Sequence, residues 1–270
     1  MDLFKTRDHV ANFDEYVAEY KALSEKTRAT LNNKIAVPYG SGANEVMDLF
    51  FPPAPMKGCP IHLFIHGGYW RMFAKDDFSF IADNVTACGA IAAVMDYDLM
   101  PGVRMGKIVD QVRLAFNWLH DHAEGLGGDA KRLSVSGHSA GAHLATFTFS
   151  LESQIPTPKS ALLLSGIYDL EPLQSSFLEP LIAISNEEVR KFSPLNLLHA
   201  SAPRVAIAYG DLETEPFSRQ AQDFADHLAS RGSKVSVTPL IASNHMSVVQ
   251  DMGNPNTAAG QLLQMTIWHS

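Results

Sequence analysis

One serine stands in the setting expected of an enzymatic nucleophile. The residues Gly-His-Ser-Ala-Gly at 137–141 follow an apolar run at 133–136 and precede a stretch that favours a helix. In this strand-turn-helix context, a G-x-S-x-G sequence places the serine in a strained turn whose backbone crowds its neighbours, so glycines are needed. Because such a turn lifts the hydroxyl above a sheet, we interpret Ser139 as a nucleophile.

The sequence also offers backbone donors for the oxyanion that forms when a serine attacks a carbonyl group. His66-Gly67-Gly68 directly follows the apolar run 61–65, and a glycine pair at a strand end can turn bare amide hydrogens inward. Removing one such donor typically costs about 3 kcal/mol of transition-state stabilisation. We expect the amides of Gly67, Gly68 and Ala140 to form an oxyanion hole.

The general base is expected near the C-terminus, because hydrolases with this elbow order their triad as serine, acid, histidine. His245 meets this expectation, since it lies in a polar loop just after the last apolar run. The acid should follow the run 205–209, where Asp211 and Glu213 are both available. A glycine, two further residues and then the acid favours Glu213, whereas Asp211 can bond its own turn. The acid stays open between the two.

Aromatic residues lie near the expected site. Tyr69 and Trp70 directly follow the glycine pair, and Tyr168 follows the run 161–164. Aromatic side chains at the mouth of a pocket can stack with an aromatic leaving group, although packing against the core is the alternative for each of them. We expect Tyr69, Trp70 and Tyr168 to bind substrate.

Composition and charge exclude several classes of function. The chain has 270 residues, of which 46% are hydrophobic and 19% charged, as in an ordinary globular enzyme. A net charge of −8 disfavours nucleic acid and anionic membranes as partners, so a small-molecule substrate is the expected partner. His62 and His66 are separated by roughly 13 Å if they lie on one strand, which is too far for shared metal coordination. We expect no metal and no other cofactor.

The cysteines and the N-terminal residues indicate where the protein works. Cys59 and Cys88 have no C-x-x-C spacing, which predicts neither a zinc knuckle nor a disulfide framework. The first residues lack the apolar run of a signal peptide, and no stretch approaches the ~18 apolar residues of a membrane span. We expect a cytoplasmic protein. The sequence leaves the oligomeric state open, a homo-oligomer included.

Apolar runs alternate with helical patterns along the chain. Six runs are apolar at successive positions, as in strands buried on both faces of a parallel sheet: 61–65, 90–95, 133–136, 161–164, 205–209 and 234–240. Helical spacing of apolar residues predicts three helices, over 12–30, 108–119 and 217–230. This order predicts an α/β fold, a doubly wound and mostly parallel sheet with helices on both faces.

We expect a single domain over 1–270 that includes two further segments. The first is an N-terminal helical segment over 1–40, which precedes the first predicted strand. The second is a small helical cap over 171–200, where three prolines separate short apolar bursts and break the strand-helix rhythm. Both segments are expected to cover the pocket and limit the size of the substrate.

Three stretches together resemble one family of enzymes: HGGYW at 66–70, GHSAGAHL at 137–144 and SGIYDLEPL at 165–173. They resemble the arylformamidase (kynurenine formamidase) group of α/β-hydrolases, which is similar to hormone-sensitive-lipase-type esterases. The resemblance extends over nearly all of the chain from residue 60 onward and implies an α/β-hydrolase fold. It also implies Ser139 as nucleophile, His245 as base and Glu213 as acid, where family members often have aspartate. The implied reaction is hydrolysis of N-formyl-L-kynurenine to formate and kynurenine.

Three functions fit these patterns. The first is an arylformamidase-like amidase that works through an acyl-enzyme, and the second is a small-molecule carboxylesterase with the same triad. The third is a non-catalytic binding module on the same fold, because fold alone does not determine function. A binding module would be expected to lack a triad member, whereas a serine, an acid and a histidine are all present here in order. The amidase is our first expectation.

Overall fold

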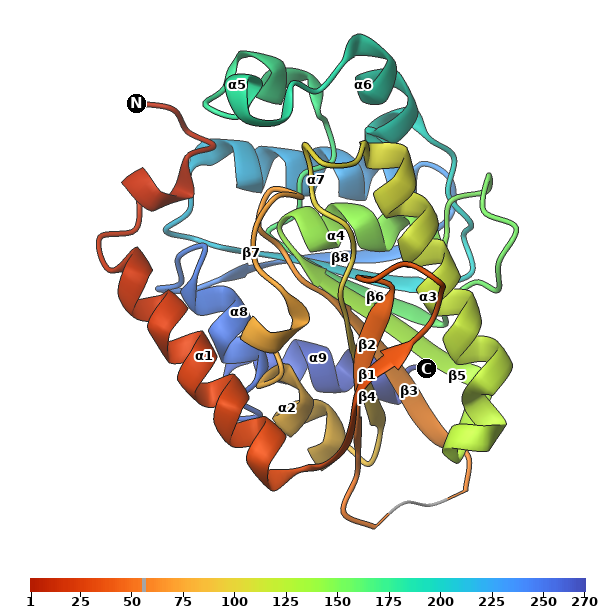
Figure 1. Cartoon of the computed structure of the whole chain (residues 1–270). Helices are drawn as coiled ribbons and strands as arrows, with labels where there is room; N and C mark the ends of the chain where they lie inside the picture. The colour runs from red at the N-terminus through yellow and green to blue at the C-terminus, as the bar shows by residue number, and fades with distance from the viewer. Residues whose placement is uncertain (55–56) are drawn as a thin grey trace.

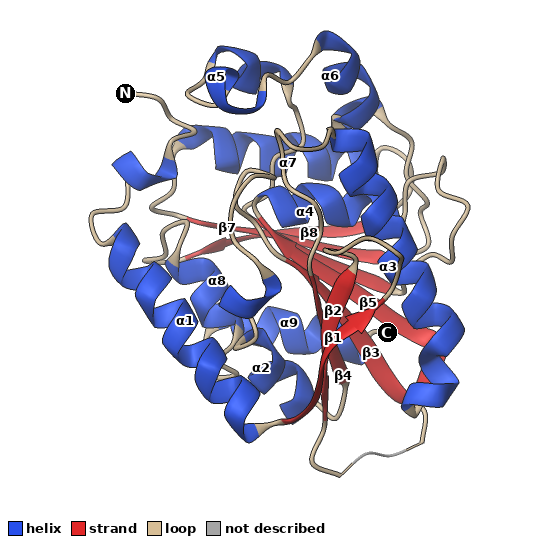
Figure 2. Cartoon of the chain, in the orientation of Figure 1, coloured by secondary structure: helices blue, strands red, loops and turns tan. Residues whose placement is uncertain are grey.

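The computed structural model describes residues 1–54 and 57–270 and is built around one eight-stranded sheet. The strands run in the order β1-β2-β4-β3-β5-β6-β7-β8 (Figures 1 and 2). Neighbouring strands from β4 to β8 pair in parallel, whereas β2 pairs antiparallel with both β1 and β4. The prediction of a mostly parallel α/β sheet is therefore confirmed. The strands are β1 (Asn32–Pro38), β2 (Val46–Phe51), β3 (Cys59–Ile65), β4 (Ile91–Met95), β5 (Gly128–His138), β6 (Ser160–Leu164), β7 (Arg204–Gly210) and β8 (Lys234–Leu240).

The six predicted runs correspond to β3 to β8, with the run 90–95 beginning one residue before β4, and the core strands are covered on both faces. In β3, Ile61, Leu63 and Ile65 pack into one hydrophobic cluster, while Phe64 packs into the cluster on the opposite face. This two-sided burial requires apolar residues at successive positions, which is the pattern in the sequence. The sequence analysis predicts neither β1, which lies in the segment 1–40 expected to be helical, nor β2. Strand β1 lies at the edge of the sheet with most of its residues exposed, and the charged Asp48 interrupts the apolar run of β2.

Helices cover both faces of the sheet (Figure 2). Buried residues of α3, α4 and α7 belong to one cluster, and those of α1, α2, α8 and α9 belong to the other. The three predicted helices are present as α1, α3 and α7, with α3 longer than expected at both ends. Within the described residues, no helix has the length and apolarity needed to cross a bilayer. The helices are α1 (Phe13–Thr30), α2 (Ile81–Ala87), α3 (Met105–Leu126), α4 (Ala140–Ala145), α5 (Glu179–Ile182), α6 (Asn186–Phe192), α7 (Glu215–Ala229), α8 (Ser247–Met252) and α9 (Ala258–Trp268).

The segment 171–200 contains the short helices α5 and α6, which lie beyond α7 at the top of Figure 1. Helix α6 begins with a capping box, in which the Glu188 amide donates to the Ser185 hydroxyl at 3.2 Å and the Ser185 amide donates to Glu188 Oε2 at 3.0 Å. The Arg104 Nε atom donates to Glu188 Oε1 at 3.1 Å. This bond fastens the segment to the residue that precedes α3.

The parallel strands bring the chemically important loops together at one edge of the sheet. Gly67 follows the carboxyl end of β3, Ser139 follows β5, Glu213 follows β7 and His245 follows β8. Because parallel strands end at the same edge, residues far apart in sequence become neighbours there. The edge at the carboxyl ends is therefore where the candidate site is found.

Burial inside the sheet predicts a pH dependence of stability. The His62 ring is fully buried between the hydroxyls of Ser134 and Ser136, 2.8 and 2.6 Å away, and burial lowers its pKa to about 3. The unfolded chain binds a proton there below pH ~6.5 and the folded chain does not, so stability is lost as the pH falls toward 3. We expect this residue to contribute about 1.4 kcal/mol per pH unit to that slope.

Urea unfolding of the His62→Gln variant between pH 4.5 and 6 measures this contribution, because glutamine keeps the polarity but does not titrate. The free energy of unfolding of the variant should change less steeply with pH than that of the unmodified chain. Equal slopes for the two proteins would contradict a neutral, buried His62.

Candidate active site

Ser139 lies in a strained turn between β5 and α4. Its backbone has φ 55° and ψ −120°, and its amide donates to the carbonyl of Leu164 at 2.8 Å. A positive φ outside glycine costs on the order of 1–3 kcal/mol and persists only where the surroundings enforce it. Ser139 is only 2% exposed. The turn therefore holds the serine inside the carboxyl edge of the sheet instead of in open solvent.

Two glycines make this turn possible. A Cβ atom on Gly141 would lie 2.0 Å from the carbonyl oxygen of Ile65, and one on Gly137 would lie 2.2 Å from the carbonyl oxygen of Gly141. Both distances are far below van der Waals contact. Glycine is therefore required at both positions, as expected for an elbow pressed against the end of β3.

His245 is bonded to one of the two candidate acids. Its Nδ1 atom lies 2.7 Å from Glu213 Oε2, and the two side chains are 6% and 1% exposed. The other oxygen, Glu213 Oε1, accepts from the hydroxyl of Ser165 at 2.5 Å and from the amide of Gly210 at 2.7 Å. Because the carboxylate accepts at Nδ1, the His245 ring is held with Nε2 as its free acceptor.

Asp211, the other candidate acid, points elsewhere. Its carboxylate accepts from the amide of Ser243 at 3.2 Å, and the residue is exposed. This is a bond within the loops that follow β7 and β8. Of the two candidates, the structure brings Glu213 to His245 and gives Asp211 a turn-forming contact.

His138 supports the loop that carries His245. Its Nε2 atom donates to the carbonyl oxygen of His245 at 2.9 Å. Burial, together with the positive charge that His245 can carry, holds the pKa of His138 well below the usual histidine value. A neutral imidazole with one nitrogen committed to a carbonyl is a structural bridge and a poor general base.

The glycine pair after β3 lies against the serine. A Cβ atom on Gly67 would be 3.2 Å from the Cβ atom of Ser139, and Gly68 has a φ of 108°, which only glycine adopts freely. Within residues 1–54 and 57–270, the amides of Gly67, Gly68 and Ala140 donate to no backbone carbonyl in a turn or loop. The glycine pair therefore lies beside the serine, with backbone amides that no such bond engages.

Ser139 and His245 line the same narrow pocket, whose cavity volume is about 20 Å³. The glycine pair forms part of its wall, and most of the other lining residues are aromatic or apolar. Thr6 and two residues of α1 also line this wall, and they belong to the N-terminal segment that was expected to cover the pocket. The further lining residues are Thr6, Phe13, Tyr20, Tyr69, Met72, Phe73, Phe78, His138 and Met246.

Of the three aromatic candidates, Tyr69 alone lines the pocket. Trp70 is fully buried and donates its indole N–H to Nδ1 of His143 at 3.2 Å. Tyr168 is also fully buried and stacks on Phe224 with ring centroids 4.4 Å apart. The structure therefore places Trp70 and Tyr168 in the core beside the site, because chain proximity to the glycines does not determine the direction of a side chain.

The Tyr69 hydroxyl fastens the first residues of the chain over the site. It donates to the carbonyl of Phe4, and the hydroxyl and amide of Thr6 lie 3.0 and 3.2 Å away. Asp2 accepts from the amide of Phe177 at 2.5 Å, which ties the same stretch to the segment 171–200. We call residues 2–10 the N-terminal strap. Figure 1 shows the N-terminus close to α5.

Comparison with known proteins identifies the family. The chain is 30% identical to kynurenine formamidase of Danio rerio over 265 residues, which cover 94% of this chain and 89% of the relative. It is 29% identical to kynurenine formamidase of Salmo salar, with 92% and 86% covered. The chain belongs to the kynurenine formamidase family. Since its relatives include esterases as well, this member of the family is a hydrolase of the serine-hydrolase type, an arylformamidase or an esterase.

One family model and two solved structures also match the chain. The family model described as BD-FAE matches residues 47–157. A candidate thioesterase from a Silicibacter species has a TM-score of 0.85 at 23% identity, with 98% of this chain and 97% of that chain covered. Carboxyl esterase 2 from Tuber melanosporum has a TM-score of 0.72 at 20% identity, with 88% and 84% covered. At these identities the solved structures establish the α/β-hydrolase fold of this family member.

In this member of the kynurenine formamidase family, substitutions of the two candidate acids are expected to have different effects on turnover. Glu213→Gln removes the charge that stabilises a protonated His245, so we expect kcat to fall roughly a thousand-fold with little change in KM. Asp211→Asn keeps an acceptor for the Ser243 amide and should stay within about twofold of the unmodified enzyme.

Steady-state kinetics on any ester or amide that the enzyme cleaves makes this comparison. Equal losses in the two variants, or a larger loss in Asp211→Asn, would show that Glu213 is not the acid.

Proposed function

We propose that Ser139, Glu213 and His245 form a catalytic triad that hydrolyses a small aryl amide, with N-formylkynurenine as the best candidate substrate. The observation that carries this proposal is the 2.7 Å contact between Glu213 and His245, beside a pocket that His245 shares with Ser139. The choice of substrate is supported by the relatives called kynurenine formamidase, which the chain matches over nearly its full length.

In the first half of the reaction, the Ser139 hydroxyl attacks the carbonyl carbon while His245 Nε2 accepts the proton. The carbonyl oxygen becomes an oxyanion, which the amides of Gly67, Gly68 and Ala140 stabilise. Glu213 keeps the ring in the required tautomer and stabilises its positive charge. When the C–N bond breaks, His245 returns the proton to the departing amine and an acyl-serine remains.

In the second half, water takes the place of the amine. His245 removes a proton from the water as its oxygen attacks the acyl-serine, and the same amides hold the second oxyanion. Collapse of this intermediate returns the proton to Ser139 and releases the acid, which is formate when the substrate is an aryl formamide. The free enzyme is restored with no change in oxidation state.

The wall of the pocket supports an aromatic leaving group. Phe13, Tyr20, Phe73 and Phe78 line it together with Tyr69, and aromatic rings favour offset or edge-on contact with another ring. We propose that Tyr69 contacts the substrate directly. Trp70 and Tyr168, which were expected to do the same, have their rings in the core and support the site from behind.

A small-molecule carboxylesterase is the second candidate, and the neutral wall of the pocket favours it. None of the described residues that line the pocket is Asp, Glu, Lys or Arg. N-formylkynurenine carries an ammonium and a carboxylate group, for which this wall offers no opposite charge. A neutral aryl ester would fit the same wall without that cost.

The organisation of the chain fits this role. We propose that residues 1–270 form a single domain in which the N-terminal segment 1–40 and the cap 171–200 restrict access to the pocket. The hydrogen bond between Asp2 and Phe177 supports this arrangement, because it joins the two segments beside the site. We also propose a cytoplasmic location, which the small number of cysteines supports.

Replacement of the nucleophile tests the triad. We expect Ser139→Ala to lower kcat by at least a thousand-fold on every substrate the enzyme hydrolyses. Ser160→Ala is a matched control, because Ser160 is an equally buried serine at the opposite end of the sheet, where its hydroxyl donates to the carbonyl of Thr266 at 2.5 Å. Normal turnover by Ser139→Ala would refute the mechanism.

The ratio of specificity constants separates the two candidate reactions. The value of kcat/KM for N-formylkynurenine should exceed that for 4-nitrophenyl acetate and butyrate if the enzyme is an aryl formamidase. A value far below those of the esters, measured on the same preparation, would favour the carboxylesterase.

A further inference from the structure

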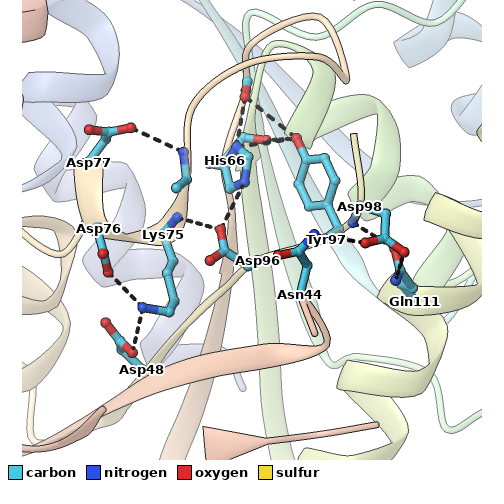
Figure 3. Close-up of polar contacts among 12 residues, drawn as sticks. Asn44, Asp48, His66, Lys75, Asp76, Asp77, Asp96, Tyr97, Asp98 and Gln111 are labelled. Carbon is cyan, nitrogen blue, oxygen red and sulfur yellow. Dashed lines mark hydrogen bonds and ion pairs between the residues drawn. The ribbon is translucent and has the colours of Figure 1, made fainter. Parts of the chain in front are cut away.

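A polar network joins His66, which directly precedes the glycine pair in the chain, to Tyr97 and Asp96 beside it (Figure 3). Asp96 and Tyr97 directly follow β4, which pairs in parallel with β3, so they lie beside His66 and the glycines that directly follow β3. The rings of His66 and Tyr97 stack with centroids 4.3 Å apart, and both residues are buried. Neither Asp96 nor Tyr97 is needed for the proton transfers described above.

The network bonds to the carbonyl groups of the glycine loop. The Tyr97 hydroxyl donates to the carbonyl oxygen of His66 at 2.8 Å. The Nδ1 atom of His66 lies 2.8 Å from the carbonyl oxygen of Gly67 and 3.3 Å from the Tyr97 oxygen. A carbonyl can only accept, so Nδ1 carries a proton and donates to Gly67. One arrangement of protons therefore satisfies all three contacts.

These carbonyls determine where the neighbouring amide hydrogens point. In a planar trans peptide, the C=O and N–H bonds point in opposite directions. The carbonyl of His66 shares its peptide with the amide of Gly67, and the carbonyl of Gly67 shares its peptide with the amide of Gly68. When both carbonyls face Tyr97 and His66, both amide hydrogens are turned away from the network. Because Gly67 lies against Ser139, an amide hydrogen that is turned away from the network can point into the site.

Glycine peptides need such a restraint. Without a Cβ atom, the backbone of Gly67 and Gly68 has a wide choice of dihedral angles, and a rotated peptide would present a carbonyl to the oxyanion. The His66 ring is itself held in place, since it stacks on Tyr97 and on Phe78 with ring centroids 4.3 and 5.9 Å apart. Asp96, the neighbour of Tyr97, is fixed by the amide of Lys75, which donates to its Oδ1 atom at 2.7 Å. The side chain of Lys75 is in turn paired with Asp48 at 3.0 Å.

We propose that Tyr97 and His66 are positioning residues that orient the Gly67 and Gly68 amides toward the transition state. The inference rests on the proposed function, because it concerns the oxyanion of the Ser139 reaction. The two side chains therefore increase the rate of the chemical step and leave the binding of the ground-state substrate nearly unchanged.

The variant Tyr97→Phe removes one hydroxyl, and Tyr39→Phe is its matched control. The Tyr39 hydroxyl donates to the carbonyl of Asp96 at 2.7 Å, and the two tyrosines are 3% and 2% exposed. Both variants thus lose a hydrogen bond from a tyrosine hydroxyl to a backbone carbonyl in the same region, but only the Tyr97 hydroxyl contacts His66 and the glycine loop. We expect Tyr97→Phe to lower kcat roughly ten-fold with KM within twofold, and Tyr39→Phe to retain its kcat.

An aryl trifluoromethyl ketone provides a readout that depends on the oxyanion itself. Such a ketone adds the serine to form a tetrahedral adduct that carries a negative oxygen. Its inhibition constant should rise roughly ten-fold in Tyr97→Phe and stay unchanged in Tyr39→Phe. Equal changes in the two variants, or a rise in KM at constant kcat, would overturn the inference.

A second pair of variants keeps the inference testable if Tyr97→Phe does not fold. His66→Asn retains a donor near the position of Nδ1, whereas His66→Ala does not. We expect His66→Asn to recover part of the kcat that His66→Ala loses, and equal kcat values would overturn the inference. The Ser139→Ala result separates the two proposals. If Ser139→Ala is inactive and Tyr97→Phe behaves like Tyr39→Phe, the triad stands and the positioning role alone fails.

Discussion

The close approach between the first turn of α4 and the end of β3 is the constraint on which the site depends. At Gly141 the position of a Cβ atom would lie only 2.0 Å from the carbonyl oxygen of Ile65 and 2.6 Å from that of His66. Because the two backbones touch here, the strained turn at Ser139 and the glycine loop are held against each other. A larger side chain at position 141 would push the serine away from the amides. The rigid sheet beneath keeps this geometry before any substrate arrives.

Local sequence determines the strands and the motifs of this fold, and these are the parts that could be predicted. Strands buried on both faces require continuous apolar runs, and the elbow requires glycine beside Ser139 for a purely local steric reason. The order of serine, acid and histidine follows from the order of the strands. The structure accordingly brings Glu213 to His245, and His245 to the pocket that contains Ser139.

Contacts between distant segments could not be predicted in the same way. The wall of the pocket includes Thr6 and Phe13. The sequence indicates that the N-terminal segment covers the pocket, but it does not indicate which of its side chains reach the wall. Strand β1 lies at an exposed edge and lacks an apolar run. Trp70 shows the opposite case, because it stands beside the glycine loop in sequence but turns its ring into the core. In each of these examples, tertiary packing decides which side chains are buried and where they point.

The N-terminal strap makes the two ends of the chain unequal for protein engineering. Met1 is exposed beside residues that bond to Tyr69 and Phe177, so any residues joined in front of it emerge next to the pocket. The last residue, Ser270, accepts from Arg132, which lies in β5 before the elbow. Ile267, also near that end, packs in the cluster on the face covered by α9. An affinity tag or fusion partner placed after Ser270 therefore lies away from the N-terminal strap, whereas one placed before Met1 adjoins residues that bond to Tyr69 of the pocket wall.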